Sequence, residues 1–218
     1  MSVELPILAA VVLIESFTGI RLILIATETR EPAELCLGIT FLSAVLLNGT
    51  SLVFSLLYDG PTLVSVITFV VAYWILSTSM VVGFWQVFRG YSRVTRAITV
   101  ILAVGLAILG VLAVLDFPSD EALKFYRLIQ AAVSIGLFTW AAIESGMRAQ
   151  KLRRQLKFGL TNIFVVHRFV LWTAAGVIWA SFYGAMLLAR YIEFPGSTLS
   201  WFTLATALIG SLLVYLTF

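Results

Sequence analysis

Seven long apolar segments, separated by short polar links, dominate the pattern along this chain. Their predicted bounds are residues 5–26, 35–58, 62–88, 97–115, 125–146, 160–189 and 198–218. An α-helix needs about 20 largely apolar residues to cross the roughly 30 Å hydrocarbon core of a bilayer, and all seven segments come close to or exceed that length. Helices that are apolar all round belong in a bilayer or in a large protein core. The pattern therefore predicts an all-α membrane protein, a single seven-transmembrane-helix bundle over residues 1–218.

Basic residues mark one side of the predicted membrane. Nine lie in the links after the first, third and fifth segments: Arg30, Arg89, Arg93, Arg96, Arg148, Lys151, Arg153, Arg154 and Lys157. Three lie in the links after the second, fourth and sixth segments: Lys124, Arg127 and Arg190. Short loops that are rich in Lys and Arg stay on the cytoplasmic side. This bias predicts an N-terminus outside, a C-terminus in the cytoplasm, and a multi-pass protein of the cytoplasmic (plasma) membrane.

Composition excludes several classes of function. Hydrophobic residues make up 61% of the chain and charged residues 11%, whereas a soluble domain is about half apolar and a quarter charged. The net charge of +3 follows from the cytoplasmic links, so we expect a lipid bilayer and no nucleic acid as partner. One cysteine and one histidine leave no ligand cluster for a metal, and no glycine-rich phosphate loop is present. We expect no metal, no cofactor and no enzymatic activity.

Polar residues at bilayer depth are the candidates for chemistry. Glu15 lies near the centre of the first segment and Asn48 lies at mid-depth in the second. A charged carboxylate at that depth costs roughly 3 kcal/mol or more, so Glu15 must be neutral, paired or next to a hydrated cavity. It could bind a proton, a cation or a polar ligand, or be a structural hydrogen-bonding group. Asn48 could contact a ligand or bond to another helix.

Aromatic residues at mid-depth indicate either a pocket or a tightly packed core. Trp74 and Thr78 are four residues apart and share a face of the third segment, and Trp179 lies in the sixth. Tryptophan usually sits at the membrane surface, so these positions are unusual. Glu15, Asn48, Trp74, Thr78 and Trp179 together form the predicted ligand or proton site.

A second group of charges lies at the predicted cytoplasmic ends of the helices. Arg21 is placed to reach the headgroups, and Glu144 and Arg148 are four apart in the order that favours a helix pair. His167 and Arg168 begin the sixth segment on the same side. Arg21 is interpreted as an interfacial charge. The other four residues could form a cytoplasmic gate or be ordinary interfacial charges.

A stripe of small residues, Gly176, Ala180 and Gly184, recurs every four residues in the sixth segment. Such stripes let two membrane helices approach closely, within one chain or between chains. The stripe is a candidate contact for a membrane protein partner or a homo-oligomer.

Three functions fit these features. The leading hypothesis is a small transporter or transport-coupled protein with a polar and aromatic site at mid-bilayer. The alternatives are a non-catalytic accessory or scaffold subunit of a larger membrane complex, and a seven-helix ligand sensor that needs a separate output partner. The direction of the small-residue faces discriminates the first two, because a transporter packs them inside its own bundle.

Overall fold

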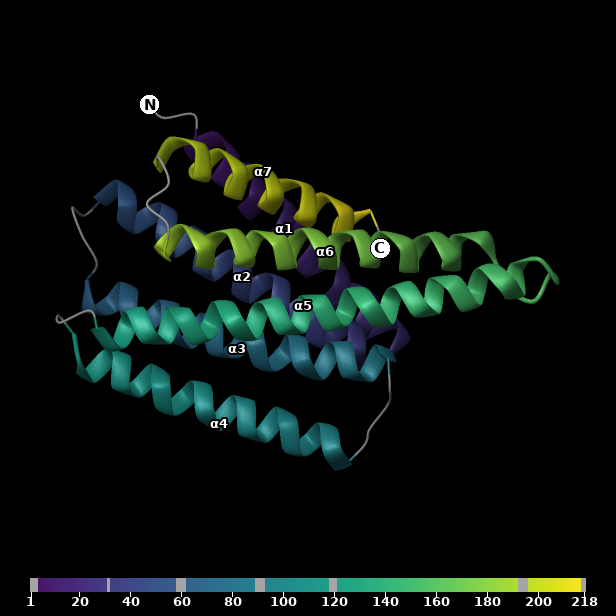
Figure 1. Ribbon diagram of the computed structural model, residues 1–218, viewed down its shortest axis with the longest axis horizontal. Coiled ribbons are helices and arrows are strands. Elements are labelled where there is room, and N and C mark those ends of the chain that lie inside the picture. Colours follow the sequence, from purple (N-terminus) through teal and green to yellow (C-terminus); the bar gives the residue numbers. More distant parts are fainter. Residues whose placement is uncertain are drawn as a thin grey trace. The chain divides into compact units, whose positions relative to one another are not determined.

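The structure is a computed structural model that describes residues 4–30, 32–57, 62–88, 93–117, 121–191 and 196–216. These residues form seven helices, without a strand in any of the described ranges (Figure 1). The helices are α1 (Glu4–Thr29), α2 (Pro32–Leu57), α3 (Leu63–Phe88), α4 (Arg93–Leu115), α5 (Glu121–Leu156), α6 (Ile163–Tyr191) and α7 (Gly196–Tyr215).

Six of these helices, α1 to α6, are long and apolar enough to cross a membrane. In α7 the described apolar segment is shorter, Ala205–Tyr215. Large apolar side chains also remain exposed along the helices; Ile101 and Leu115 of α4 are 72% and 75% exposed. Such faces suit contact with lipid tails, which are as apolar as leucine. These features indicate an all-helical, multi-pass membrane protein.

The helix boundary that differs most from the expected one is the end of α5. The apolar pattern ends α5 at Gly146, but the helix continues to Leu156. The added segment consists mostly of Arg, Ala, Gln, Lys and Leu, which are good helix formers although they are not all apolar. Gly159 ends it with φ +69°, the left-handed conformation that glycine adopts most easily. Asn162 then caps α6, because its Oδ1 accepts the Phe164 N–H at 3.0 Å.

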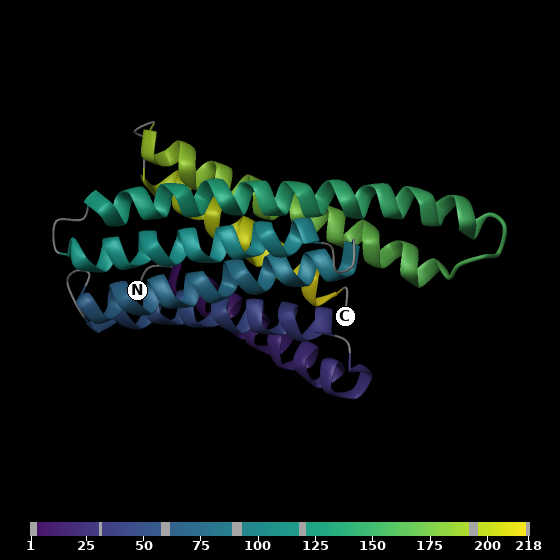
Figure 2. The same ribbon diagram turned by 90° about the horizontal axis from the view of Figure 1, so that it is seen from below.

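The chain divides into two compact units, residues 1–130 and 131–218, and α5 contributes to both. In the first unit α2 packs on α1 and on α3, and α4 packs on α3 (Figure 2). Two buried tyrosines tie α3 to the start of α5. The Tyr73 hydroxyl donates to the Gln130 carbonyl at 2.9 Å, and the Tyr126 hydroxyl donates to the Val70 carbonyl at 3.3 Å. A buried tyrosine needs such a partner for its hydroxyl group.

A tight turn pairs α1 with α2. Arg30 has φ 57°, and Pro32 starts α2, where its missing N–H leaves no hydrogen bond unmade. Gly19 and Gly38 meet along this pair. A Cβ at Gly38 would lie 3.1 Å from the Gly19 carbonyl oxygen, and a Cβ at Gly19 would lie 3.2 Å from the Gly38 carbonyl oxygen. Larger side chains at these two positions would push the two backbones apart.

In the second unit α6 packs on the later part of α5 and on α7. A Cβ at Gly176 would lie 3.0 Å from the Ala142 Cβ and from the Phe138 carbonyl oxygen, so this glycine sits directly on the α5 backbone. A Cβ at Gly210 of α7 would lie 2.8 Å from Nε1 of Trp179. Both glycines therefore pack inside this unit.

Candidate functional site

Glu15 lies in the middle of the buried stripe of α1. The stripe recurs every three or four residues, as one face of a helix must, and comprises Val11, Glu15, Thr18, Leu22 and Ala26. Glu15 is 1% exposed. It is the only carboxylate of this stripe, and apolar residues lie one turn before it and two turns after it. The structure thus places an acidic side chain inside the protein, near the middle of α1.

Asn48 of α2 is the hydrogen-bond partner of Glu15. Its side-chain Nδ2 donates to Oε2 of Glu15 at 2.9 Å. The tight turn at Arg30 brings the two residues to one level, because Glu15 precedes the turn by about as many residues as Asn48 follows it. We name this interaction the Glu15–Asn48 pair. The sequence predicts each residue as a site candidate, and the structure brings the two together.

The chemistry of the pair is that of a carboxyl group with a neutral partner. An amide donates a hydrogen bond but carries no charge that could compensate a carboxylate. The basic residue of α1, Arg21, is exposed. The bond engages one carboxyl oxygen, Oε2, and leaves Oε1 for a proton or a ligand. The arrangement can bind and release a proton, or contribute one ligand to a small cation.

Hydroxyl groups are also buried elsewhere in the first unit. Thr40 of α2 and Ser79 of α3 share a hydrogen bond of 2.8 Å. The hydroxyl groups of Ser77 and Thr78 are buried, and neither has a hydrogen-bond partner among the described residues. Thr78 is a predicted site residue, and its hydroxyl group is therefore available to an additional donor or acceptor. Ser77, which is 0% exposed, is a candidate that the sequence reasoning did not single out.

Trp74 lies on the face of α3 that meets α4. Its indole Nε1 donates to the Ala103 carbonyl of α4 at 2.8 Å, and the side chain is 37% exposed. The predicted site joins Trp74 to Glu15 and Asn48, whereas the structure shows the indole bonded to a different helix. Sequence spacing shows which residues share a face of α3, but it does not show which neighbouring helix that face meets.

Trp179 belongs to the second unit and packs in an aromatic cluster there. Its ring centroid lies 5.8 Å from that of Phe138, 5.4 Å from that of Phe182 and 6.3 Å from that of Tyr183. Aromatic pairs at these separations stabilise each other beyond their burial. The predicted aromatic face of α6 is thus engaged in packing within its unit.

The predicted cytoplasmic-side charges differ in environment. Arg21, His167 and Arg168 are exposed, while Glu144 is 7% exposed. The guanidinium carbon of Arg148 lies 6.0 Å from the centroid of the Phe169 ring, within reach of a cation–π interaction. Glu144, Arg148, His167 and Arg168 lie on α5 and α6 of the second unit, whereas Arg21 lies on α1 of the first.

The small-residue stripe of α6 is used unevenly. Gly176 contacts α5, as described above, whereas a Cβ at Gly184 would have no described atom within 4 Å. Ala180 between them is half-buried. The stripe is therefore a contact inside the chain at one end and open, among the described residues, at the other.

Within the described ranges, no group of three or more His, Cys, Asp or Glu side chains is arranged to hold a metal ion. Comparison with known proteins adds nothing further. No family model, curated protein or solved structure matches this chain. Its function must therefore be inferred from the site itself.

The pairing of Gly19 with Gly38 is a feature that sequence reasoning missed. Neither glycine has another glycine within two turns of its own helix, so neither belongs to a repeating stripe of small residues. The signal is the predicted short link between the first two helices, which places residues at similar distances from Arg30 at the same level. The same signal would have paired Glu15 with Asn48.

Proposed function

We propose that this chain is a small membrane transporter, or a transport-coupled membrane protein, in which Glu15 binds and releases a proton or a small cation. The Glu15–Asn48 pair carries the proposal. In the proposed topology seven helices form one transmembrane domain, with the N-terminus outside and the C-terminus in the cytoplasm, in the plasma membrane. The function requires no enzymatic step and no cofactor.

Energetics support a role for Glu15 beyond structure. A charged carboxyl at mid-bilayer costs about 3 kcal/mol on insertion scales. A hydrogen bond between membrane helices contributes about 0.6 kcal/mol on average and at most about 1.7 kcal/mol. The bond to Asn48 does not offset the cost of the charge, and a glutamine at position 15 could keep the bond at a lower cost. What only a carboxyl adds is the ability to titrate.

The packed glycines support the same function. Gly19, Gly38 and Gly176 face neighbouring helices of their own unit. Small residues inside a chain's own helix pairs are expected of a self-contained transporter, whereas an accessory subunit turns them outward against another chain. Three separate positions in the two units follow the transporter pattern.

An accessory subunit of a larger membrane complex is the second candidate. Gly184 favours it, because the described residues leave this small position open. In that case the chain would be found bound to other membrane proteins, and purified chain in liposomes would move no solute.

The test is transport by purified protein in liposomes. We expect Glu15→Gln to fold like the wild type and to lose pH-dependent solute or proton movement, because glutamine keeps the size and the hydrogen bond but cannot titrate. Glu34→Gln is the matched control, since Glu34 lies near the start of α2 and bonds to Thr29 at 2.8 Å. It should transport like the wild type.

The measurement is the signal of a pH-sensitive dye trapped in the liposomes, across a panel of solutes. If Glu15→Gln transports as well as the wild type, Glu15 is not the titrating group and the proposal is wrong. If the wild type moves nothing and always co-purifies with a larger complex, the accessory subunit replaces the transporter.

A further inference from the structure

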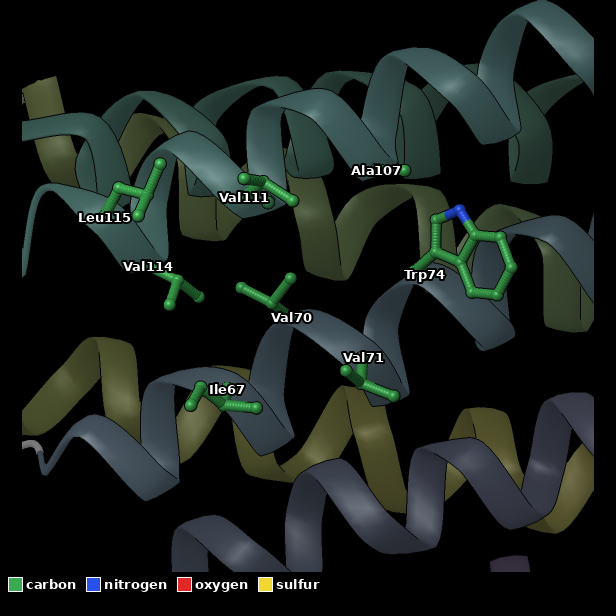
Figure 3. Close-up of a pocket in the computed structure, with 9 residues that line it drawn as sticks. Ile67, Val70, Val71, Trp74, Ala107, Val111, Val114 and Leu115 are labelled. Carbon is green, nitrogen blue, oxygen red and sulfur yellow. The ribbon is translucent and has the colours of Figure 1, made fainter.

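An apolar groove of about 470 Å³ runs between α3 and α4 in the first unit. Figure 3 shows its two walls, with Ile67, Val70, Val71 and Trp74 on α3 and with residues such as Val111 and Leu115 on α4. We call it the α3–α4 groove. Its volume lies within the range of about 300–1,000 Å³ that is typical of small-molecule sites.

The lining of the groove excludes a polar occupant. Every side chain in its walls is apolar or aromatic. The indole N–H of Trp74 is the polar group among them, and it already bonds to the Ala103 carbonyl. A polar ligand would lose its hydrogen bonds to water and find none here, at a cost of about 1–3 kcal/mol for each group. The occupant must therefore be hydrocarbon.

The groove is slightly shorter than the hydrocarbon layer of one leaflet, so it lies within a single leaflet. It extends from Ile67 to Trp74 on α3, about 10 Å at the α-helical rise, and from Ala107 to Leu115 on α4, about 12 Å. Half of the hydrocarbon core measures about 15 Å. Trp74 and Ala103 lie near the midpoints of α3 and α4. Their hydrogen bond closes the groove at mid-bilayer, and its other end lies where α3 begins and α4 ends.

The shape of the groove argues against a partner helix. A helix is about 10–12 Å wide with its side chains, and it would pack along the whole span of α3 and α4. Trp74 bridges the two helices halfway along and would obstruct it. At the floor a Cβ at Gly110 would collide with Cγ1 of Val70, so the Val70 side chain already packs directly against the α4 backbone. A single flexible chain can end at Trp74, whereas a continuous helix cannot.

We propose that the α3–α4 groove holds one acyl chain of a membrane lipid, from the leaflet in which α3 begins and α4 ends, with the end of the chain against Trp74. The side chains at the rim face the lipid phase, since Val71 is 50% exposed and Val111 is 58% exposed. A chain can therefore enter from the side. This site is separate from the Glu15–Asn48 pair and does not depend on the transport function.

The test uses purified chain in lipid nanodiscs with photoreactive phosphatidylcholine. One reagent carries a diazirine at the end of its acyl chain and a second carries it near the carboxyl group. Mass spectrometry of the digested protein then maps the labelled residues. We expect the first reagent to label Trp74 and Val71, and the second to label Ile67 and Leu115. Both reagents should label the groove residues more strongly than Ile101, which is also exposed but lies outside the groove.

Ala107→Phe fills the groove and should abolish the excess labelling, while Ile101→Phe on the same helix should keep it. Val111→Phe at the rim replaces Ala107→Phe if that variant does not fold, and the wild-type depth pattern decides independently of both. Equal labelling of Ile101 and the groove would overturn the proposal. So would excess labelling that persists in both Ala107→Phe and Val111→Phe. A photoreactive residue at Val111 in native membranes should give a lipid adduct, and an adduct with another membrane protein would overturn it too.

Discussion

At the scale of single residues, Glu15 and Asn48 show how a membrane interior handles a polar group. Glu15 is 1% exposed and Asn48 Nδ2 lies 2.9 Å from its Oε2. Removing one partner leaves the other without a hydrogen bond inside the protein, where the lost bond is not replaced by water. The two residues should therefore depend on each other for stability even if neither moves a proton.

A double-mutant cycle measures that dependence. We expect Asn48→Ala to destabilise the wild type more than it destabilises the Glu15→Leu variant, with a coupling energy of about 0.6–1.7 kcal/mol. The measurement is unfolding in mixed micelles with increasing denaturant, followed by circular dichroism. The same cycle between Glu34 and Asn48 serves as the control and should show no coupling. Additive effects of Glu15→Leu and Asn48→Ala would mean that the bond contributes nothing to stability.

At the scale of helices, close packing depends on the positions of the glycines. Gly176 sits on the α5 backbone at Ala142, and Gly38 sits against Ile23 and the Gly19 carbonyl. Lipid tails and apolar side chains are equally hydrophobic, so close contact rather than hydrophobic burial holds two membrane helices together. A glycine therefore contributes most where a neighbouring backbone touches it, and little where its surroundings are open.

The two glycines of α6 make this argument testable with a matched pair. Gly176→Leu should destabilise the protein by about 1–3 kcal/mol, the usual cost of overpacking, because the added side chain meets Ala142 and the Phe138 carbonyl. Gly184→Leu should be tolerated in the isolated chain, because no described atom lies within 4 Å of its Cβ position. Thermal unfolding of both variants in detergent compares them directly. Equal destabilisation of the two would contradict the packing of α6 on α5.

If Gly184→Leu is stable as an isolated chain but fails to assemble in native membranes, the open end of the stripe binds another chain. That result would favour the accessory subunit over the transporter, and native gel electrophoresis of solubilised membranes detects it.

At the scale of the whole molecule, the number of spans decides where the two ends of the chain lie. Six described helices are apolar and long enough to cross a bilayer, and the proposed topology adds α7 as a seventh. With seven spans the two termini lie on opposite sides of the membrane, and with six they lie on the same side. The basic links then assign the cytoplasmic side.

Cysteine labelling tests this topology. In a Cys36→Ser background, which removes the one native cysteine, Lys157→Cys should react with a membrane-impermeant maleimide only from the cytoplasm. Glu121→Cys should react only from outside, and a cysteine added after Phe218 only from the cytoplasm. The reverse pattern for the first two positions would invert the orientation. Labelling of the added cysteine from outside would remove one span.

The sequence by itself determined the class of the fold. Helices of about 20 apolar residues are a direct consequence of bilayer thickness and of the need to satisfy every backbone hydrogen bond, so their existence and approximate positions follow from composition along the chain. The exact helix ends did not follow in the same way, because hydropathy indicates where a helix leaves the lipid and not where the helix itself stops. The end of α5 depends instead on helix propensity and on Gly159.

Tertiary structure decided which of the candidate residues meet. Glu15, Asn48 and Trp74 all lie near the middle of their helices, and depth is what a sequence pattern reveals. Whether two residues at one depth touch depends on how each helix is rotated and which neighbour it meets. The turn at Arg30 directs Glu15 to Asn48, and the contact of α3 with α4 directs Trp74 to Ala103. Depth is a property of the chain and its solvent, whereas contact is a property of the packed helices.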